Sequence, residues 1–523
     1  MPTPNDYDRI AYPSFAHAQT FAENLATKGW LRGMDVAPPD HCRVLELGCG
    51  DGFNLVVMAQ RYPKAHYTGL DYAADAIDRG RRMVEELGLS QVRLEAADIR
   101  NLPPDLGEFD YIIAHGVFSW VPLEVADAVL QTMEDHLAPQ GVGFVSYLAL
   151  PGAQMREMVR LMLNFHTQGE SEPTRRIQQA RGLLHLLSNA TTEANHYTQW
   201  LKSESAVIAA HTDAAFFHDE LSTFSHSFLF TDFLRQASTH QLAFLSEAEY
   251  LIPVSINLTD EAKRILKPLE ADRVMLEQYL DFVEGRRFRQ TLLCRPGNGA
   301  SLTAARVRRF HIRFAGQTTA EGSLDLAAPA ELTIKGERDA VLHVKTPVEK
   351  AMLLALRDSP DALPYPELCE LALARLKTAG LAIPPDADQS LALLAVRAAV
   401  PQLIELTWGM PPATAVAPAR PLASPLARWQ VAQGHKSITT LGGPSLAFEG
   451  ELGRFLLSRM DGTRDRTVLL SEVQSYLTRV HAEAKAAGRT FSGPLPDAPD
   501  LELQLSNSLQ SLARFGLILR DGP

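Results

Sequence analysis

The sequence predicts an α/β fold for its first third, built on a doubly wound parallel sheet. A mainly helical part and a C-terminal α+β part follow. Short apolar runs alternate with stretches of helical periodicity over residues 41–155, as in parallel-sheet proteins. The first run, Val44–Leu47, stops at Gly48, Gly50 and Gly52. A strand, a tight turn and a helix start in this order form a pocket for a nucleotide-like ligand.

The composition narrows the class of protein. A length of 523 residues suggests two to four domains, and 46% apolar with 21% charged residues is typical of a globular protein. The net charge of −12 and the lack of a basic block argue against nucleic-acid binding. No apolar run reaches the roughly 18 residues of a membrane span, and residues 1–9 lack a signal-peptide pattern. The four cysteines are scattered and form no zinc motif, which fits free thiols in a reducing cytosol and no bound metal. Together these observations lead us to expect a soluble cytoplasmic protein.

The strands and helices of the first part can be placed individually. The apolar runs predict strands at 44–48, 66–71, 91–96, 109–115 and 142–148. The helical periodicity between them predicts helices at 53–61, 74–87 and 123–137. Their regular alternation is the basis for the parallel sheet.

The glycine spacing separates three kinds of nucleotide site. A P-loop requires a lysine after the loop, and none is present. A dinucleotide fingerprint has its third glycine one position later, where Phe53 stands. The Gly-x-Gly-x-Gly spacing, with Glu46 two residues before Gly48, resembles motif I of class I S-adenosylmethionine-dependent methyltransferases with a Rossmann-like domain. A glycine-rich turn without a ligand is the alternative.

Two acids at predicted strand ends fit the same cofactor. Asp71 ends the second strand, where a carboxylate can accept from both ribose hydroxyls. Asp98 follows the third strand, where it can accept from the adenine amino group while Ile99 covers the ring. For S-adenosyl-L-methionine and its product S-adenosyl-L-homocysteine, the expected binding residues are Glu46, Gly48, Cys49, Gly50, Asp71, Tyr72, Asp98, Ile99 and His115.

Candidate catalytic residues lie on three segments. His115 and Trp120 follow the fourth strand, as a proton acceptor and an apolar wall, or as packing residues. Tyr12 belongs to an aromatic N-terminal segment that either closes over the cofactor or anchors a helix. Tyr147 lies on the fifth strand, and Tyr12 and Tyr147 are further candidate proton acceptors. The Asn/Asp-Pro-Pro-Tyr motif of many amine-methylating enzymes is absent after the fourth strand, so the loop alone does not identify an amine substrate.

A second landmark is Glu277–Cys294, with the sequence EQYLDFVEGRRFRQTLLC. Together with 115–121, 218–221 and the opening Tyr7-Asp8 and Tyr12-Pro13-Ser14, it resembles bacterial, rickettsial-type protein-lysine methyltransferases that carry a methyltransferase regulatory domain. The resemblance covers residues 1 to about 300. This chain departs from the family at Phe21-Ala22, where relatives have His-Pro, and at Leu148-Ala149, where many have Asn-Thr. These departures leave the acceptor group and the number of methyl groups open.

The predicted domain organisation has five parts. They are an aromatic lid segment (1–40), the methyltransferase domain (41–155) and a helical regulatory domain (156–298). A strand-rich linker with a first winged-helix-like module (299–410) and a C-terminal helical, winged-helix-like module (411–523) follow. In the last two parts, alternation predicts strands at 307–314 and 330–344, helix-turn-helix units at 346–377 and 449–477, and a linker at 409–425. The acidic balance favours protein docking over DNA binding for these modules.

Three functions are consistent with these patterns. The first is methylation of lysine side chains in a protein substrate with exposed lysines. The second is methylation of a small metabolite or natural product, with the helical domain as a lid. The third is a cofactor-binding sensor without catalysis. A homodimer is left open, and neither nucleic acid nor a membrane span is expected.

Overall fold

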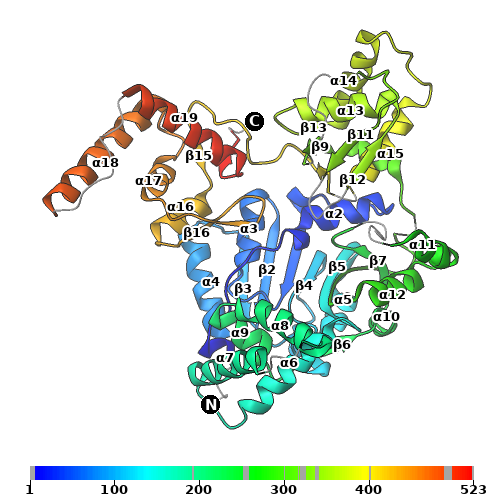
Figure 1. Cartoon of the computed structure of the whole chain (residues 1–523), viewed down its shortest axis with the longest axis vertical. Coiled ribbons are helices and arrows are strands. Elements are labelled where there is room, and N and C mark those ends of the chain that lie inside the picture. Colours follow the sequence, from blue (N-terminus) through cyan, green and yellow to red (C-terminus); the bar gives the residue numbers. More distant parts are fainter. Residues whose placement is uncertain are drawn as a thin grey trace. The chain divides into compact units, whose positions relative to one another are not determined.

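The computed structural model describes residues 6–190, 194–250, 258–299, 301–315, 317–318, 325–335, 341–399, 402–487 and 498–520 (Figure 1). The chain divides into two compact units. The first holds residues 1–14, 19–56 and 64–303, and the second holds residues 15–18, 57–63 and 304–523.

A mixed sheet organises the first unit. Its strand order is β3-β2-β1-β4-β5-β8-β7, and the short β6 pairs with the end of β5. The five strands from β3 to β5 in this order are parallel, whereas β8 is antiparallel to β5 and to β7. The bounds are β1 Arg43–Leu47, β2 His66–Asp71, β3 Val92–Ala96, β4 Phe109–Ala114, β5 Leu137–Ala149, β6 Ser227–Phe228, β7 Ala243–Glu247 and β8 Phe288–Cys294. All five predicted strands are confirmed.

The core explains why these strands read as continuous apolar runs. Leu45, Ile112 and Val145 are fully buried, because helices cover both faces of the parallel part of the sheet. The helices are close to the predicted spans: α3 Phe53–Arg61, α4 Ala74–Glu86 and α5 Leu123–His136. Short 3-10 turns flank the sheet at η1 Ala18–Thr20, η2 Pro39–His41 and η3 Ile99–Asn101. At the N-terminal side lie α1 Asp6–Arg9 and α2 Ala22–Leu31.

Two strands from beyond the expected domain boundary at 155 complete the first sheet. Strands β7 and β8 belong to the same sheet as β1–β5, so the helices from α6 to α10 are inserted between the fifth strand and the last two. Leu292 and Leu293 are both fully buried, which gives β8 no alternation by which to recognise a half-buried strand. The helices are α6 Ala153–His166, α7 Pro173–Asn189, α8 His196–Ala209, α9 Asp213–Glu220, α10 Phe230–Thr239, α11 Asp260–Leu266, η4 Lys267–Ala271 and α12 Arg273–Glu284.

The second unit contains two helix-turn-helix units that the sequence predicts. They are formed by α13 Pro347–Asp358 with α14 Tyr365–Thr378, and by α17 Glu451–Arg459 with α18 Arg466–Ala486. The strand expected at 307–314 is wrong over its first half, which is the 3-10 helix η5 Ala304–Arg309. Buried Val307 and Phe310 are three residues apart, the period of such a helix, and only β9 His311–Phe314 is extended.

Small sheets accompany these helices. Strand β9 pairs with β13 Leu363–Pro364 and β14 Ile404–Thr407, and β11 Leu332–Lys335 lies between β10 Gln317–Thr318 and β12 Val341–Val344. The middle of the strand region predicted at 330–344 lies outside the described residues. The remaining elements are α15 Ala387–Ala399, β15 Leu422–Ala423, α16 Pro425–Ala432, β16 Ser437–Thr439, β17 Ser445–Ala447, α19 Ala498–Arg514 and β18 Ile518–Leu519.

Candidate functional site

The glycine loop joins β1 to α3 at the carboxyl edge of the sheet. Gly48 and Gly50 have φ values of +72° and +57°, in the left-handed region that favours glycine. A Cβ on Gly48 would stand 2.3 Å from Val117, so the loop lies tightly against the start of the β4–α5 loop. A Cβ on Gly50 would meet nothing within 4 Å. The backbone at Gly50 is therefore open to the close approach of a ligand.

The Asp71 carboxylate is fixed beside this loop. The backbone N–H of Gly50 donates to its Oδ2 at 2.7 Å, and the N–H of Ala73 donates to its Oδ1 at 2.8 Å. Asp71 is half-buried at the end of β2 and thus holds the loop against the neighbouring strand. A rigid acceptor at this edge suits a ligand with neighbouring hydroxyl groups.

Glu46 lies under the loop and is 4% exposed. Its Oε1 accepts from Asn54 Nδ2 at 2.9 Å, and the same amide group donates to Thr20 Oγ1 at 2.9 Å. Its Oε2 has no hydrogen-bond partner among the described residues. Burial raises the pKa of Glu46 to about 8, against the opposing effect of the Asn54 hydrogen bond. The site is therefore suited to a cationic donor, which would satisfy Oε2 and stabilise the carboxylate.

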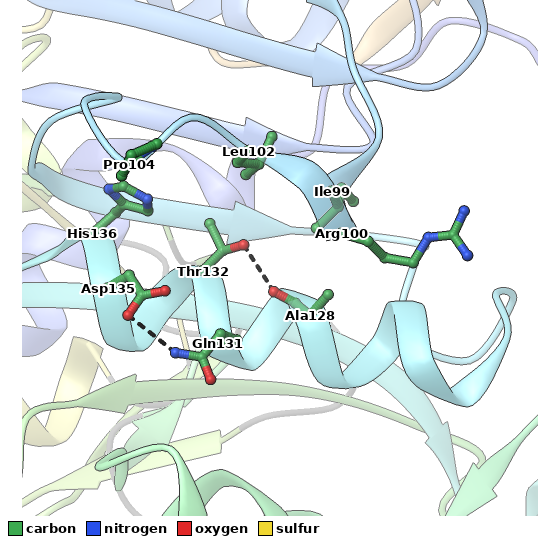
Figure 2. A pocket seen from close by; sticks show the side chains of 9 residues that line it. All are labelled: Ile99, Arg100, Leu102, Pro104, Ala128, Gln131, Thr132, Asp135 and His136. Carbon is green, nitrogen blue, oxygen red and sulfur yellow. Dashed lines mark hydrogen bonds between the residues drawn. The ribbon is translucent and has the colours of Figure 1, made fainter.

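Asp98 and its neighbours lie at the end of β3. The Asp98 carboxylate accepts from Arg100, from the backbone N–H at 3.0 Å and from Nη2 at 2.7 Å, and these hydrogen bonds lower its pKa. Ile99 lines a cavity of about 430 Å³ between η3 and α5, together with Thr132 and His136 (Figure 2). Tyr72 is exposed on the loop after β2. The Asp98 carboxylate thus already accepts from a cation, and a ligand amino group would share this carboxylate with Arg100.

His115 and Trp120 follow β4. The half-buried His115 ring stands edge-on to Phe144 and Phe288, at 5.8 and 6.2 Å between ring centroids. Trp120 is half-buried, and the guanidinium carbon of Arg160 lies 4.9 Å from the centroid of its ring. Aromatic rings therefore surround His115, and the Trp120 ring carries a cation against it.

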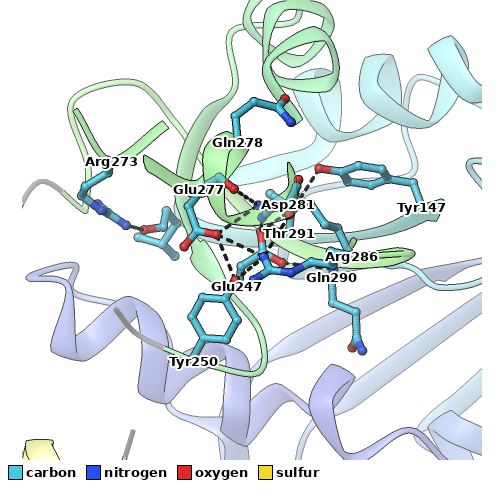
Figure 3. A network of polar contacts seen from close by, with 12 residues as sticks. Tyr147, Glu247, Tyr250, Arg273, Glu277, Gln278, Asp281, Arg286, Gln290 and Thr291 are labelled. Atoms are coloured by element: carbon cyan, nitrogen blue, oxygen red, sulfur yellow. Dashed lines mark hydrogen bonds and ion pairs between the residues drawn. The ribbon is translucent and has the colours of Figure 1, made fainter. Parts of the chain in front are cut away.

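The placement of Tyr147 contradicts its predicted role as a proton acceptor for substrate. Its side chain has no exposed surface, and its ring stacks on Phe233 at 4.1 Å. Its hydroxyl shares a hydrogen bond with Thr291 of β8 at 3.1 Å (Figure 3). Alternation along β5 directs this side chain into the core, so we omit Tyr147 from the catalytic set.

The N-terminal aromatic segment lies against α9 and against the glycine loop. Tyr7 stacks on the His218 ring at 4.3 Å, and Tyr12 meets the same ring edge-on at 5.6 Å. The Tyr12 hydroxyl donates to Asp219 Oδ1 at 3.4 Å. The Ser14 hydroxyl donates to the Asp51 carboxylate within the glycine loop. Because Tyr12 is only two residues from Ser14, its Cα lies within about 7 Å of the Ser14 Cα.

Charged groups surround Tyr12. Burial, followed by the charge of Asp219, raises the pKa of the Tyr12 phenol, which therefore stays protonated near neutral pH. Burial and the neighbouring Glu220 also raise the pKa of Asp219. Glu220 is fully buried and paired with Arg156 of α6. Sequence reasoning missed Asp51, Arg156 and Asp219 as site residues. For Asp51 and Asp219 the signal was present, since one lies between two loop glycines and the other in the quoted stretch 218–221.

The landmark Glu277–Cys294 forms a buried ionic network (Figure 3). The guanidinium of Arg289, which is 1% exposed, donates to Asp281 at 2.8 and 2.9 Å, to Glu247 at 2.7 Å and to Glu277 at 3.0 Å. It also lies 3.9 Å from the ring of Phe230. The network joins α10, α12, β7 and β8, so it fixes these helices to the sheet. Phe288 of the same landmark contacts the His115 ring.

Two absences apply to the described part of the chain. There, no three His, Cys, Asp or Glu side chains come together in a way that would hold a metal ion. Within the same residues, no helix has both the length and the apolar character needed to cross a membrane.

Three family models match the chain. They are the "Methyltransferase domain" over residues 44–141, the "Predicted methyltransferase regulatory domain" over 212–295, and the "PKMT, C-terminal winged helix domain" over 419–517. The first covers the glycine loop and Asp71, and the second covers α9 and the Arg289 network. The third includes the helix pair α17–α18.

Relatives from rickettsiae match over long stretches. Uncharacterized protein RP028 of Rickettsia prowazekii is 34% identical over 44% of this chain and 93% of its own length. Uncharacterized protein RP789 of the same organism is 31% identical over 68% of this chain, and the match spans 65% of its length. The solved structure of PKMT2 from Rickettsia typhi has a TM-score of 0.81 at 25% identity and covers 97% of this chain and all of that chain. Its complex with AdoHcy gives 0.80 at 24% identity, covering 97% and 99%.

Proposed function

We propose that this chain methylates lysine side chains of a polypeptide substrate. The chain belongs to the class I S-adenosylmethionine-dependent methyltransferases that carry a methyltransferase regulatory domain. The observation that carries the proposal is the agreement of the whole architecture with PKMT2, the winged-helix domain included. The resemblance of residues 277–294 to bacterial protein-lysine methyltransferases supports the same substrate class.

The residues of the glycine-loop site fit the cofactor. The orphaned Oε2 of buried Glu46 would accept from the amino group of the methionine part. The open space at Gly50 would let the cofactor approach the backbone of the glycine loop. The Asp71 carboxylate beside this loop would accept from the ribose hydroxyls. Tyr72, Asp98, Ile99 and His115 complete the proposed binding set with Gly48 and Cys49. When bound, S-adenosylmethionine supplies an activated methyl group on its sulfonium sulfur.

The protein's contribution to the transfer is mainly positional. An amine must be brought in line with the methyl group, and it must lose its proton first. The N-terminal segment is held to the glycine loop through Ser14 and Asp51, and this contact supports our assignment of Tyr12, two residues earlier, to the substrate side of the cofactor site. Aromatic and apolar surroundings lower the pKa of a lysine amine because burial disfavours its charged form.

The proposed roles of the catalytic residues follow from their protonation. Tyr12 keeps its proton, so it orients the amine through its hydroxyl and ring and does not act as the base. We assign the proton acceptor to His115, whose half-buried ring stands edge-on to Phe144 and Phe288, because a neutral imidazole nitrogen can accept a proton. Trp120 forms an apolar wall on the substrate side.

The test is transfer of labelled methyl from S-adenosylmethionine into proteins of a lysate from the source cell. Proteins are separated by size, and the labelled band is digested for mass spectrometry. The expected result is a labelled protein with mass shifts of one or more methyl groups on lysine. Label confined to small molecules would refute the polypeptide substrate and favour a metabolite methyltransferase. Cofactor binding without any transfer would refute catalysis. We further propose a cytoplasmic location, and the choice between monomer and homodimer stays open.

A further inference from the structure

A second cavity lies among the inserted helices, away from the glycine loop. Its volume is about 500 Å³, and it is bounded by α6, the start of α7 and the segment after α9. Its lining combines two arginines with hydroxyl and amide groups: Arg160, Arg176, Asn164, Thr167, Ser222 and Thr223. Two glutamates, Glu157 and Glu170, also line the cavity and balance the two arginines in number.

Arg160 is the key group of this cavity. It is 3% exposed, and its Nε and Nη1 have no hydrogen-bond partner among the described residues. Its Nη2 donates to the Ser222 carbonyl at 3.3 Å, and Glu157 lies 3.1 Å from its Nε. Burial lowers the pKa of Arg160 despite Glu157. Its Nη1 is thus a buried N–H donor without an acceptor among the described residues, and a ligand oxygen would satisfy it.

The acids around the cavity are already engaged. Glu157 accepts from the Ser225 hydroxyl at 2.5 Å besides pairing with Arg160. Glu170, which also lines the cavity, accepts from the backbone N–H of Glu172 at 2.9 Å. Arg176 donates to Asn164 Oδ1 at 2.8 Å and adds a second positive charge. Arg160 Nη1 can therefore donate to an incoming carboxylate.

The cavity adjoins the proposed acceptor site through Arg160. The same guanidinium that lines the cavity covers the ring of Trp120 at 4.9 Å. The segment after α9 is also fixed to the Trp120 loop, because His226 N–H donates to the Ser119 carbonyl at 2.9 Å. A ligand that binds Arg160 therefore contacts the same guanidinium that packs on Trp120.

Apolar side chains beside the cavity favour a polypeptide as the source of the carboxylate. Leu161, which lines the cavity, and Phe165 are each 73% exposed. With exposed Met158 they occupy positions three and four residues apart, so they share one face of α6. A small dicarboxylate needs no such face, whereas a bound chain would cover it. We propose that this cavity binds an acidic side chain of the polypeptide substrate, close in sequence to the lysine that is methylated; this inference rests on the proposed function.

The test compares pairs of lysine peptides that differ by one Glu or Gln, placed in turn from four residues before to four after the lysine. At one position the Glu peptide should have about tenfold higher kcat/KM, mostly through KM, as expected for one charge-assisted hydrogen bond. Thr223→Glu puts a competing carboxylate at the exposed rim and should reduce the ratio to about one. Thr223→Gln is the matched control and should keep it. Arg160→Met should abolish the preference as well, and Thr223→Glu keeps the test valid if that variant misfolds.

Equal rates for Glu and Gln at every position, or a preference unchanged by Thr223→Glu, would overturn the inference. Binding is measured separately by calorimetry with a lysine-free Glu and Gln peptide pair, with succinate and with inorganic phosphate. Binding of succinate or phosphate without a preference for the Glu peptide would overturn the polypeptide source. If no peptide is methylated but the Glu peptide binds and the Thr223→Glu substitution weakens this binding, the proposed function fails and the cavity still binds an acidic side chain. Methylation without any acidic preference gives the reverse result.

Discussion

Replacement of Asp71 by Asn tests the cofactor site most directly. The carboxylate accepts at 2.7 Å from Gly50 N–H and at 2.8 Å from Ala73 N–H, so it serves two purposes, holding the loop and presenting acceptors to the proposed ribose. An amide keeps the shape but replaces one acceptor oxygen by a donor, which then faces an N–H group or a hydroxyl.

The magnitude follows from the number of bonds affected. Hydrogen bonds to charged groups contribute about 1.5–3 kcal/mol each, and the replaced charge affects at least one such bond to the ligand besides the loop contact. We expect a loss of roughly 2–4 kcal/mol in binding, which raises Kd by about 30- to 700-fold at 1.4 kcal/mol per factor of ten.

Isothermal titration calorimetry with S-adenosylhomocysteine measures the change, and thermal unfolding of the unliganded variant checks that the fold persists. Asp75→Asn is the matched control, because Asp75 is an exposed aspartate in the first turn of α4, four residues further on. It should leave Kd within about twofold, since surface substitutions rarely change free energies by more than about 0.5 kcal/mol. A folded Asp71→Asn protein with wild-type affinity would refute the ribose assignment.

Three further predictions concern other groups. The pKa of Glu46 is raised from 4.5 to about 8, so between these pH values the folded chain keeps a proton that the unfolded chain releases. The free energy of unfolding should therefore decrease as the pH rises from 4.5 to 8. Urea unfolding measured across this pH range should show the decrease in the wild type, and the Glu46→Gln variant should lack the part due to Glu46. Tyr12→Phe should lower kcat at unchanged cofactor Kd, whereas equal kcat would return Tyr12 to a packing role. Arg289→Met should cost about 3–5 kcal/mol of unfolding free energy because it leaves buried carboxylates unpaired, while the exposed Arg93→Met should change it by less than about 1 kcal/mol.

Local patterns predicted much of the fold. The runs at 44–48 and 109–115 are apolar because both faces of these strands are covered, and the glycines after the first run need positive φ. Such signals lie within a few residues of one another and need no partner to be read. The helix pairs at 346–377 and 449–477 were recognisable for the same reason.

The errors arose where distant segments decide the role of a residue. Tyr147 was placed near substrate by its position at a strand end, but β8 and Phe233 enclose it, and both are far away in the sequence. The return of β7 and β8 to the first sheet, beyond the expected domain boundary at 155, likewise depends on pairing with distant strands. The family resemblance marked Glu277–Cys294 without revealing that Arg289 holds three acids in the core.

The sequence by itself determined the parallel sheet, the glycine loop and the positions of Glu46 and Asp71, because strand periodicity, turn residues and motif spacing are local properties. Only the tertiary structure decided that Glu46 has an oxygen without a hydrogen-bond partner among the described residues, that Ser14 reaches Asp51, and that Arg160 joins a cavity to Trp120. These features depend on burial and on contacts between segments that lie about 40 residues apart along the chain. Burial sets the electrostatic cost of each charge, and no local pattern reports it.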